Sequence, residues 1–477
     1  MPDKAKQVWE ELQPTGSIDS VTAVIKRPKI DAEIDTEITL LEGRDASPNG
    51  GKKSLRLLPR KLPYLLDDVS GKVVYRNGLV TIEDATAQNG ATRLSIKGEC
   101  SSISEQQWLA DITWLPNTRV MVDSQFVRAL PVSIQESMRK LDFYGPISIK
   151  GKSQTVFGKE EKDIQSAWDC MLDIEDGRLA SGAHLAAMRG TIWLRGNLNS
   201  QHLNATGQIA MDAMRVLKTP VTNMTGPFVI LDSKLFFGSA VQEALPNPNP
   251  ADRPADITAS ALAGTLKLSG SGRLDTGKFY VDSQLQNARL SYLLKDIGIQ
   301  SQQPDATCNA TLKFSGVPWN PQTYDGDGEI KLTDAKLYEL PFMMRLFSVT
   351  SVNASDASAF QTAECKFQLD GEHIPLQISA DGEVLRLRGE GWTNLRRDVD
   401  LQLYTYVGRK VPIGAIVSPL LPESRFSTFM MVEVTGTLDN PDMQRKAFPQ
   451  LEATLQQMFP EVAERRPIRD TIQRWKN

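Results

Sequence analysis

The strongest constraint on the fold is a five-residue phrase, apolar–any–apolar–any–glycine, that recurs along the chain. Successive side chains of a β-strand point to opposite faces, so each copy has an apolar face and a face that is mostly polar. This period of two predicts half-buried antiparallel sheet. The eight copies begin at Leu94, Ile147, Ile192, Leu266, Leu312, Phe367, Leu385 and Val432.

Turn chemistry agrees with that interpretation. Asparagine or aspartate followed by glycine adopts the positive φ angles of tight type I′ hairpin turns. Such pairs stand at 77–78, 89–90, 176–177 and 381–382. Strand-like segments flank two of them, 73–75 with 79–82 and 376–378 with 385–387, and predict hairpins there.

The expected fold class is therefore mainly β, an elongated and twisted antiparallel sheet built from repeated β units. A few short helices are expected, over 5–12, 124–141 with Pro131 starting or kinking its main part, 290–297, 342–349 and 443–459. Composition shifts and irregular insertions divide the chain into four parts. These are a first helix-plus-β unit (1–155), a second β unit (156–250), a third β unit (251–442) and a helical tail (443–477).

Charge and hydropathy exclude several classes of protein. The 477 residues include 54 Lys and Arg against 58 Asp and Glu, a net charge of −4, so nucleic acid is not expected as a partner. The opening residues have no apolar signal core, and no run of about 18 apolar residues occurs. As written, the sequence has neither an export signal nor a membrane span.

Neither catalytic nor metal-binding residues are predicted, and no cofactor is expected. The three histidines do not have metal-ligand spacing, and the four cysteines form no Cys-x-x-Cys pair, so we expect buried thiols. A disulfide stays open, since four cysteines allow three full pairings. The residues are His184, His202 and His373, and Cys100, Cys170, Cys308 and Cys365.

One acidic segment has the carboxylate density of a calcium loop. It reads Asp325-Gly-Asp327-Gly-Glu329, but it does not have the twelve-residue spacing of an EF-hand. We therefore expect a solvated turn. Acidic pairs such as Asp67-Asp68 and Glu160-Glu161 give no sign of facing each other across a cleft, as a carboxylate-based hydrolase requires.

Residues 328–441 resemble the C-terminal region of the AsmA-like envelope proteins, the family of AsmA, TamB and YhdP. The resemblance rests on the order of several phrases. These are Gly328 to Pro341, the apolar helix Phe342 to Val349, the hairpin segments 366–371 and 376–391, the strand 400–403, and Val434-Thr-Gly-Thr-Leu-Asp-Asn-Pro441. They cover about a quarter of the chain, and the upstream β repeats are compatible with the same family.

The resemblance implies a periplasmic protein of diderm bacteria that carries phospholipid along a β groove and supports outer-membrane assembly. Family members are anchored in the inner membrane by an N-terminal helix. This sequence has no such anchor, so it is expected to be either the C-terminal portion of a longer protein or a chain with a mis-set start. The implied partners are phospholipid or another acyl-chain ligand, the inner membrane through an upstream anchor, and envelope proteins. No catalytic residues come with the family.

A sheet with one continuous apolar face must cover that face with another layer or offer it to apolar ligands. Exposed apolar surface costs about 25 cal/mol per Å², so a few hundred Å² favour acyl chains by several kcal/mol. The predicted lipid-lining positions are Leu94, Ile96, Ile147, Ile149, Leu266, Leu268, Phe279, Val281, Leu312, Phe314, Phe367, Leu369, Leu385, Leu387, Leu401 and Leu403. The helix 342–347 is expected to cap the groove.

Three alternatives remain open. The same positions fit an ordinary closed core, in a structural scaffold or an adhesin-like module of the periplasm that binds protein or glycan. A β-rich polysaccharide-active enzyme requires clustered carboxylates in an open cleft. The basic C-terminal residues Arg465, Arg466 and Arg474 fit either contact with anionic lipid head groups or an exposed tail.

Overall fold

A computed structural model gives the fold of the chain. It describes residues 9–18, 20–26, 35–42, 54–60, 63–76, 78–104, 107–130, 132, 135, 138–139, 142–158, 164–180, 184–199, 202–244, 254–296, 306–333, 361–382, 385–408, 426–438 and 440–446. The predicted helix 342–349 and the basic tail from Arg465 onwards lie outside these residues.

The chain forms two compact units. The first comprises Met1–Leu217, Val221–Ile257 and Ser271–Gly277, and the second comprises Lys218–Pro220, Thr258–Gly270 and Lys278–Asn477. Both are mainly antiparallel β, with few short helices, which confirms the predicted fold class.

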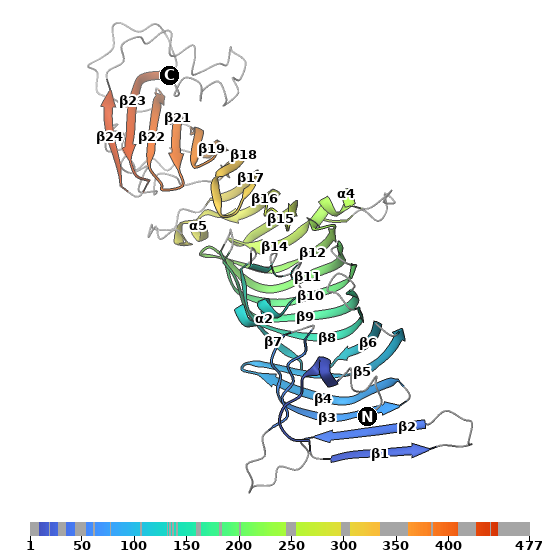
Figure 1. The fold of residues 1–477 in the computed structure, drawn as a ribbon. Helices are drawn as coiled ribbons and strands as arrows, with labels where there is room; N and C mark the ends of the chain where they lie inside the picture. The colour runs from blue at the N-terminus through green and yellow to red at the C-terminus, as the bar shows by residue number, and fades with distance from the viewer. Residues whose placement is uncertain are drawn as a thin grey trace. The chain divides into compact units, whose positions relative to one another are not determined.

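The strands of the first unit are hydrogen-bonded in series, so most strands pair with the strands next to them in the sequence (Figure 1). Strands β6 and β7 together fill the place between β5 and β8. The strands are β1 (Ser20–Lys26), β2 (Asp35–Glu42), β3 (Asp67–Arg76), β4 (Leu79–Asn89), β5 (Thr92–Ser104), β6 (Gln107–Trp114), β7 (Arg119–Val122), β8 (Phe143–Phe157), β9 (Gln165–Leu179), β10 (Leu185–Asn199), β11 (His202–Val216), β12 (Thr219–Leu231) and β13 (Lys234–Phe237).

The second unit repeats this plan from β16 to β24, where each strand pairs antiparallel with the next (Figure 1). Its strands are β14 (Ile257–Ala261), β15 (Gly264–Arg273), β16 (Phe279–Arg289), β17 (Thr307–Val317), β18 (Asn320–Thr333), β19 (Thr362–Asp370), β20 (His373–Asp381), β21 (Leu385–Asn394), β22 (Val399–Gly408), β23 (Phe426–Gly436) and β24 (Pro441–Lys446). The first residue of β14 and the last three of β15 belong to the first unit.

Helices are short throughout the described residues. The first unit has α2 (Ser124–Ala129), the 3-10 helix η2 (Gly238–Ala240) and α4 (Val241–Ala244), and the second has α5 (Leu290–Asp296). Helix α5 confirms the prediction for 290–297, and residues 9–12 are helical as expected.

The helix predicted over 124–141 is interrupted. The Asp123 carboxylate caps α2 by accepting hydrogen bonds from the backbone N–H groups of Gln125 and Phe126. Leu130 ends the helix in an extended conformation, because the residue before a proline is disfavoured in the α region.

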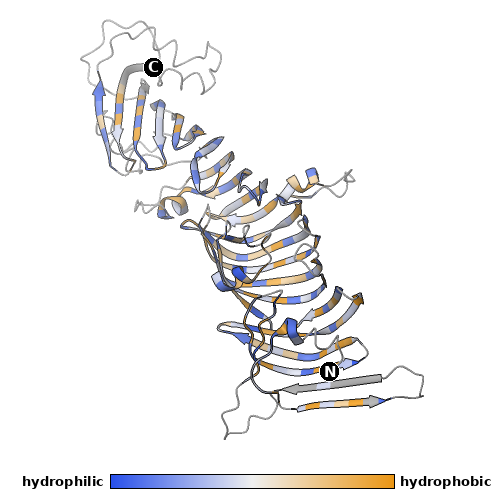
Figure 2. Ribbon diagram, viewed as in Figure 1, coloured by the Kyte–Doolittle hydropathy of each residue, from blue (hydrophilic) through white to orange (hydrophobic). Residues whose placement is uncertain are grey.

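Register divides the sheet into two faces, visible as alternating colours along the strands in Figure 2. Across β8 to β11, Ile149 faces Leu172, which faces Ile192, which faces Ile209. The adjacent row on the other face runs from Lys150 through Met171 and Trp193 to Gln208. The sheet therefore has an apolar face and a polar face, as the period of two predicts.

Two predicted hairpins are confirmed in the first unit. Strands β3 and β4 are joined by a two-residue turn, because Arg76 pairs with Leu79, and Gly78 has a φ of +89°. The next predicted hairpin also forms, but its turn is shifted by one residue to Gly90 and Ala91, because Asn89 ends β4 and pairs with Thr92.

The pair Asp176-Gly177 does not form the predicted turn, since both residues lie inside β9. Gly177 is buried, and an ideal Cβ there would lie 2.7 Å from the Ile174 side chain and 3.0 Å from the Phe143 ring. This glycine makes room for neighbouring side chains. At the fourth pair, β20 ends at Asp381 and β21 begins at Leu385, so a hairpin forms as expected.

The helix predicted to start at 443 is wrong for the residues that the structure describes. Residues 441–446 form β24, in which Met443 pairs with Val434. The Lys446 ammonium lies 2.8 Å from the Glu433 carboxylate. Pairing with β23 therefore overrides the local helical preference of this segment. The rest of the predicted helix lies outside the described residues.

Candidate functional site

The recurring phrase places its two apolar residues and its glycine on one face, and its glycines accept close neighbours. At Gly151 an ideal Cβ would lie 2.3 Å from the Asp169 carbonyl oxygen of the neighbouring strand. Gly328 belongs to none of the eight copies but accepts a large side chain in the same way, because an ideal Cβ there would lie 2.3 Å from the Phe367 ring at the paired position of β19. These glycines let strands and large side chains approach closely on the apolar face.

In the first unit the apolar face over β9 to β11 contains both buried residues, such as Ile174 and Met211, and half-buried ones. Its central residues are Leu172, Ile192, Leu194 and Ile209, and each has an intermediate exposure. Leu172 pairs with the predicted position Ile149, and Ile192 and Ile209 continue the same row across the next strands, but none of the four was among the predicted lining residues. The same period-two signal, followed through 168–174 and 203–211, identifies them.

Helix α2 packs on the apolar face of the sheet at β7, where the helix covers one part of this face. Val120, Val122 and Val127 form a buried cluster. Leu94, Ile147 and Ile149 pack against that cluster and stay half-buried. Here the protein supplies part of its own second layer, as the closed-core alternative expects. Ile96, on the same strand as Leu94, is also half-buried.

In the second unit an aromatic group lies on the apolar face of β16 to β18. The Phe279 and Phe314 rings make an edge-to-face contact with centroids 5.1 Å apart. The Tyr324 ring lies 6.3 Å from Phe279, and its hydroxyl donates to the Pro318 carbonyl oxygen at 3.1 Å. Further predicted positions on the unit's strands are half-buried, namely Leu266, Leu268, Val281, Leu312, Phe367 and Leu369. The Leu385 side chain lies outside the described residues.

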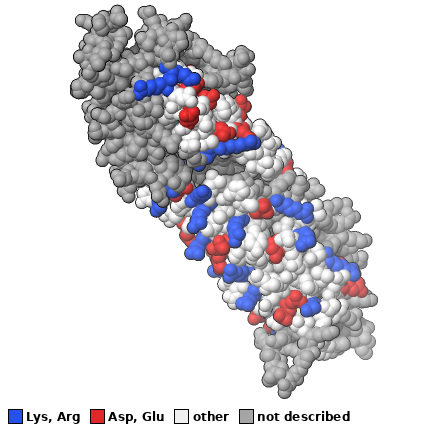
Figure 3. All heavy atoms as spheres, turned by 90° about the vertical axis from the view of Figure 1, so that its left-hand side faces the viewer, with Lys and Arg blue, Asp and Glu red and all other residues white. Residues whose placement is uncertain are grey.

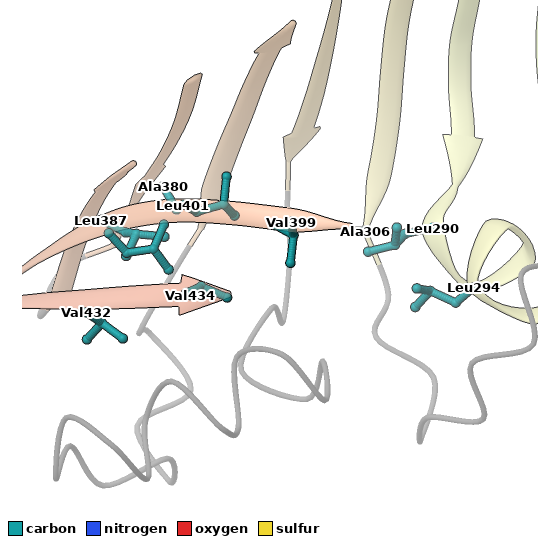
Figure 4. Packing of buried hydrophobic residues seen from close by; sticks show 10 residues of the cluster. Leu290, Leu294, Ala306, Ala380, Leu387, Val399, Leu401, Val432 and Val434 are labelled. Atoms are coloured by element: carbon teal, nitrogen blue, oxygen red, sulfur yellow. The ribbon is translucent and has the colours of Figure 1, made fainter. Parts of the chain in front are cut away.

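Three predicted lining residues are core residues in the structure. Leu387, Leu401 and Leu403 are 2%, 3% and 0% exposed and belong to one buried cluster with Val432 and Val434 (Figure 4). The cluster is completed by Leu290, Leu294, Ala306, Ala380 and Val399, and its first two members come from α5. The face over β21 to β23 is therefore closed to ligands in this structure.

The opposite face carries rows of alternating charge on β18 and β19, and Figure 3 shows basic and acidic side chains interspersed over one side of the molecule. On β18 and β19, the Lys331 ammonium lies 2.7 Å from Glu329, and Lys366 lies 3.3 Å from Glu329 and 2.8 Å from Glu364. The hydrogen bond with Glu364, followed by those with the two lysines, lowers the pKa of Glu329 to about 2.

The acidic segment 325–329 belongs to this polar face. It was predicted to be a turn, but Asp325, Asp327 and Glu329 lie in β18. Asp327 of β18 pairs with Lys313 of β17, so opposite charges also face each other across these two strands. Among the described residues, no group of three or more His, Cys, Asp or Glu side chains is arranged to hold a metal ion.

The four cysteines are free thiols, and the expectation that they are buried holds for two of them. Cys170 and Cys308 are buried, and Cys100 and Cys365 are half-buried. Desolvation raises the pKa of both Cys100 and Cys365 to about 11. The thiolate form is therefore scarce near neutral pH, which makes these thiols poor nucleophiles.

Within the described part of the chain, no helix combines the length and apolar character that crossing a bilayer requires. Comparisons with protein-family models, with curated proteins and with solved structures gave no match.

Proposed function

We propose that the chain handles phospholipid or other acyl-chain ligands on the apolar face of its sheet, without covalent chemistry, as an AsmA-like protein of the bacterial periplasm. The proposal includes transfer of lipid between inner and outer membranes in support of outer-membrane assembly. Its main support is the half-buried apolar row through Leu172, Ile192 and Ile209. The resemblance of residues 328–441 supplies the family and the location.

The physical argument rests on the difference between two parts of the apolar face. Leu403 and Val432 have no exposed surface, whereas Ile192 and Leu194 keep between about a tenth and a third of theirs. Residual apolar surface arranged in a row along strands suits an acyl chain, because the binding free energy follows apolar contact area. Such a site selects for chain length and shape more than for placed polar groups.

Mass spectrometry of bound lipid tests the proposal with a matched pair of variants. Ile192→Glu places a carboxylate on the apolar face, and Gln208→Glu places one on the polar face of the neighbouring strand, where Gln208 is exposed. Protein incubated with phosphatidylethanolamine vesicles should retain phospholipid in the wild type and in Gln208→Glu, and lose it in Ile192→Glu. Absence of lipid from folded wild-type protein contradicts the proposal.

A photoreactive side chain gives a second readout that tolerates weak binding. Placed at Leu194, it should cross-link to phospholipid, whereas at the adjacent Arg195, on the other face, it should not. Equal cross-linking at both positions indicates adsorption of lipid without a site.

A structural scaffold is the second function, and the buried cluster around Leu403 favours it for the last strands of the second unit. There the sheet has its own apolar cover, as in a closed module that offers only its outer surface to protein or glycan. Lipid-free protein with normal folding supports this function over the first.

A further inference from the structure

Two arginines oppose each other where β5 meets β7. Arg93 and Arg119 are the only backbone partners that these two strands share in the described residues, so both side chains leave the sheet on its polar face. Like charges directly opposite each other on one face destabilise an antiparallel pair. A negatively charged group placed between the two guanidinium groups would relieve this repulsion.

The protein compensates only one of the two charges. The Arg119 guanidinium lies 2.7 Å from the Glu175 carboxylate of β9. Within the described ranges no carboxylate pairs with Arg93, which is exposed. Its guanidinium offers five N–H donors in a planar fork that matches carboxylate and phosphate groups.

Both arginines line a depression of about 510 Å³, within the size range of small-ligand sites. The amide side chains of Gln88 and Asn117 also line it, and Met121 and Pro146 add apolar surface. No carboxylate is among the lining residues. The lining therefore offers guanidinium and amide N–H donors, set among largely apolar surface, and these donors suit an anion.

Side-chain hydrogen bonds hold the two strands at this position although they share one backbone pair. The Thr92 hydroxyl accepts the Met121 N–H at 2.9 Å and the Tyr64 hydroxyl proton at 2.9 Å. The Thr118 hydroxyl donates to the Ser95 carbonyl oxygen at 2.7 Å and accepts the Ser95 N–H at 3.2 Å. Both threonines are fully buried. The depression is thus fixed before any ligand arrives, which lowers the cost of binding.

We propose that this depression binds the phosphate group of a phosphate ester, with Arg93 as its main contact and Arg119 as a second. The ester is either a lipid head group or a small soluble phosphate compound. This site lies on the polar face and does not depend on acyl-chain binding to the apolar face.

Calorimetry and vesicle flotation on the full chain test the site. The probes are glycerol 3-phosphate and vesicles of phosphatidylcholine with and without phosphatidylglycerol. Arg93→Gln removes the uncompensated charge, and Lys97→Gln removes an exposed charge from the same face of the same strand as a control. Loss of a charged phosphate contact should weaken binding about tenfold or more in Arg93→Gln and less than about twofold in Lys97→Gln.

The two probes distinguish the sources of the phosphate. Binding of glycerol 3-phosphate indicates soluble esters, whereas binding only to phosphatidylglycerol vesicles indicates head groups. Neither probe binding the wild type, or equal loss in both variants, overturns the proposal. Ile192→Glu separates this site from the proposed function, because that variant should lose acyl-chain binding and keep phosphate binding.

The melting temperature distinguishes a ligand-binding Arg93 from a structural one. Replacing an arginine that stabilises the fold would lower the melting temperature. Because Arg93→Gln removes a like-charge pair, it should raise the melting temperature without ligand and abolish the rise that glycerol 3-phosphate causes in the wild type. A lower melting temperature in the absence of ligand contradicts the reasoning.

Discussion

Replacing Gly328 with alanine tests whether this strand glycine makes room for a large side chain on the paired strand. An ideal Cβ at this position lies 2.3, 2.7 and 2.9 Å from three atoms of the Phe367 ring. Carbon atoms approach favourably at about 3.5 Å, so the ring must move by roughly 1.2 Å. Gly328 has an ordinary strand conformation, so the substitution itself introduces no backbone strain.

Two opposing effects determine how much Gly328→Ala changes the free energy of unfolding. Overpacking of this kind costs about 1–3 kcal/mol. Alanine in place of an unstrained glycine stabilises by about 0.4–1 kcal/mol, because the unfolded chain loses conformational freedom. The net expectation for Gly328→Ala is a destabilisation of about 1.5 kcal/mol. In a Phe367→Leu background the ring tip is gone, and the same substitution should instead stabilise by about 0.4–1 kcal/mol.

Hydrogen exchange read on peptides from β18 and β19 measures the local opening free energy without assuming that the whole chain unfolds in one step. Gly328→Ala alone should speed exchange there by about tenfold, and in the Phe367→Leu background it should slow exchange. A similar acceleration in both backgrounds refutes the role of the ring.

Three further predictions follow from the core, the polar face and the thiols. Leu403→Ala removes a side chain with no exposed surface, and should lower the free energy of unfolding of the second unit by about 2–5 kcal/mol in hydrogen exchange; a loss below about 1 kcal/mol contradicts the closed core. Glu329 has a lowered pKa, so its stabilising effect is complete above its unfolded pKa of about 4.3 and is lost as the pH falls toward 2. Glu329→Gln should therefore flatten the loss of stability between those pH values, measured by thermal unfolding, and an unchanged acid profile counts against the network. Cys100 and Cys365 should react with iodoacetamide at pH 8 only after denaturation, as read by mass spectrometry, and rapid labelling of the native protein would contradict their raised pKa.

The strands were predictable because the signal that forms them is local. All eight copies of the recurring phrase lie in strands, and only the glycine of the copy at Phe367 falls just beyond its strand, at Gly371. Each copy shows its two faces within five residues, so no distant contact is needed to recognise it.

The errors occur where distant contacts override local preference. Asp176-Gly177 has the composition of a turn, but β8 and β10 pair along both sides of β9 and keep the chain extended. Residues 443–446 have helix-forming side chains, but pairing with β23 holds them in a strand. In both cases the decisive hydrogen bonds come from another strand.

Which apolar positions are closed and which are accessible was not predictable. Leu403 and Leu194 have the same alternating context, yet the first is buried and the second is half-buried. The difference lies in the tertiary neighbours, since Leu403 belongs to a buried cluster with residues of other strands, such as Leu387 and Val432, that the local sequence does not reveal. The depression beside Arg93 was missed for a similar reason, because β7 meets β5 only through the fold.

The serial pairing of strands determines how far the effect of a destabilising substitution extends within each unit. A strand such as β10 takes its hydrogen bonds from β9 and β11, and most of these partners are close in sequence. Stability in such an array is close to a sum of nearest-neighbour terms, as in repeat proteins. A destabilising substitution in one strand therefore promotes unfolding of the adjacent strands first and leaves remote hairpins folded. Such a protein tolerates local substitutions that would unfold a protein with a single enclosed core.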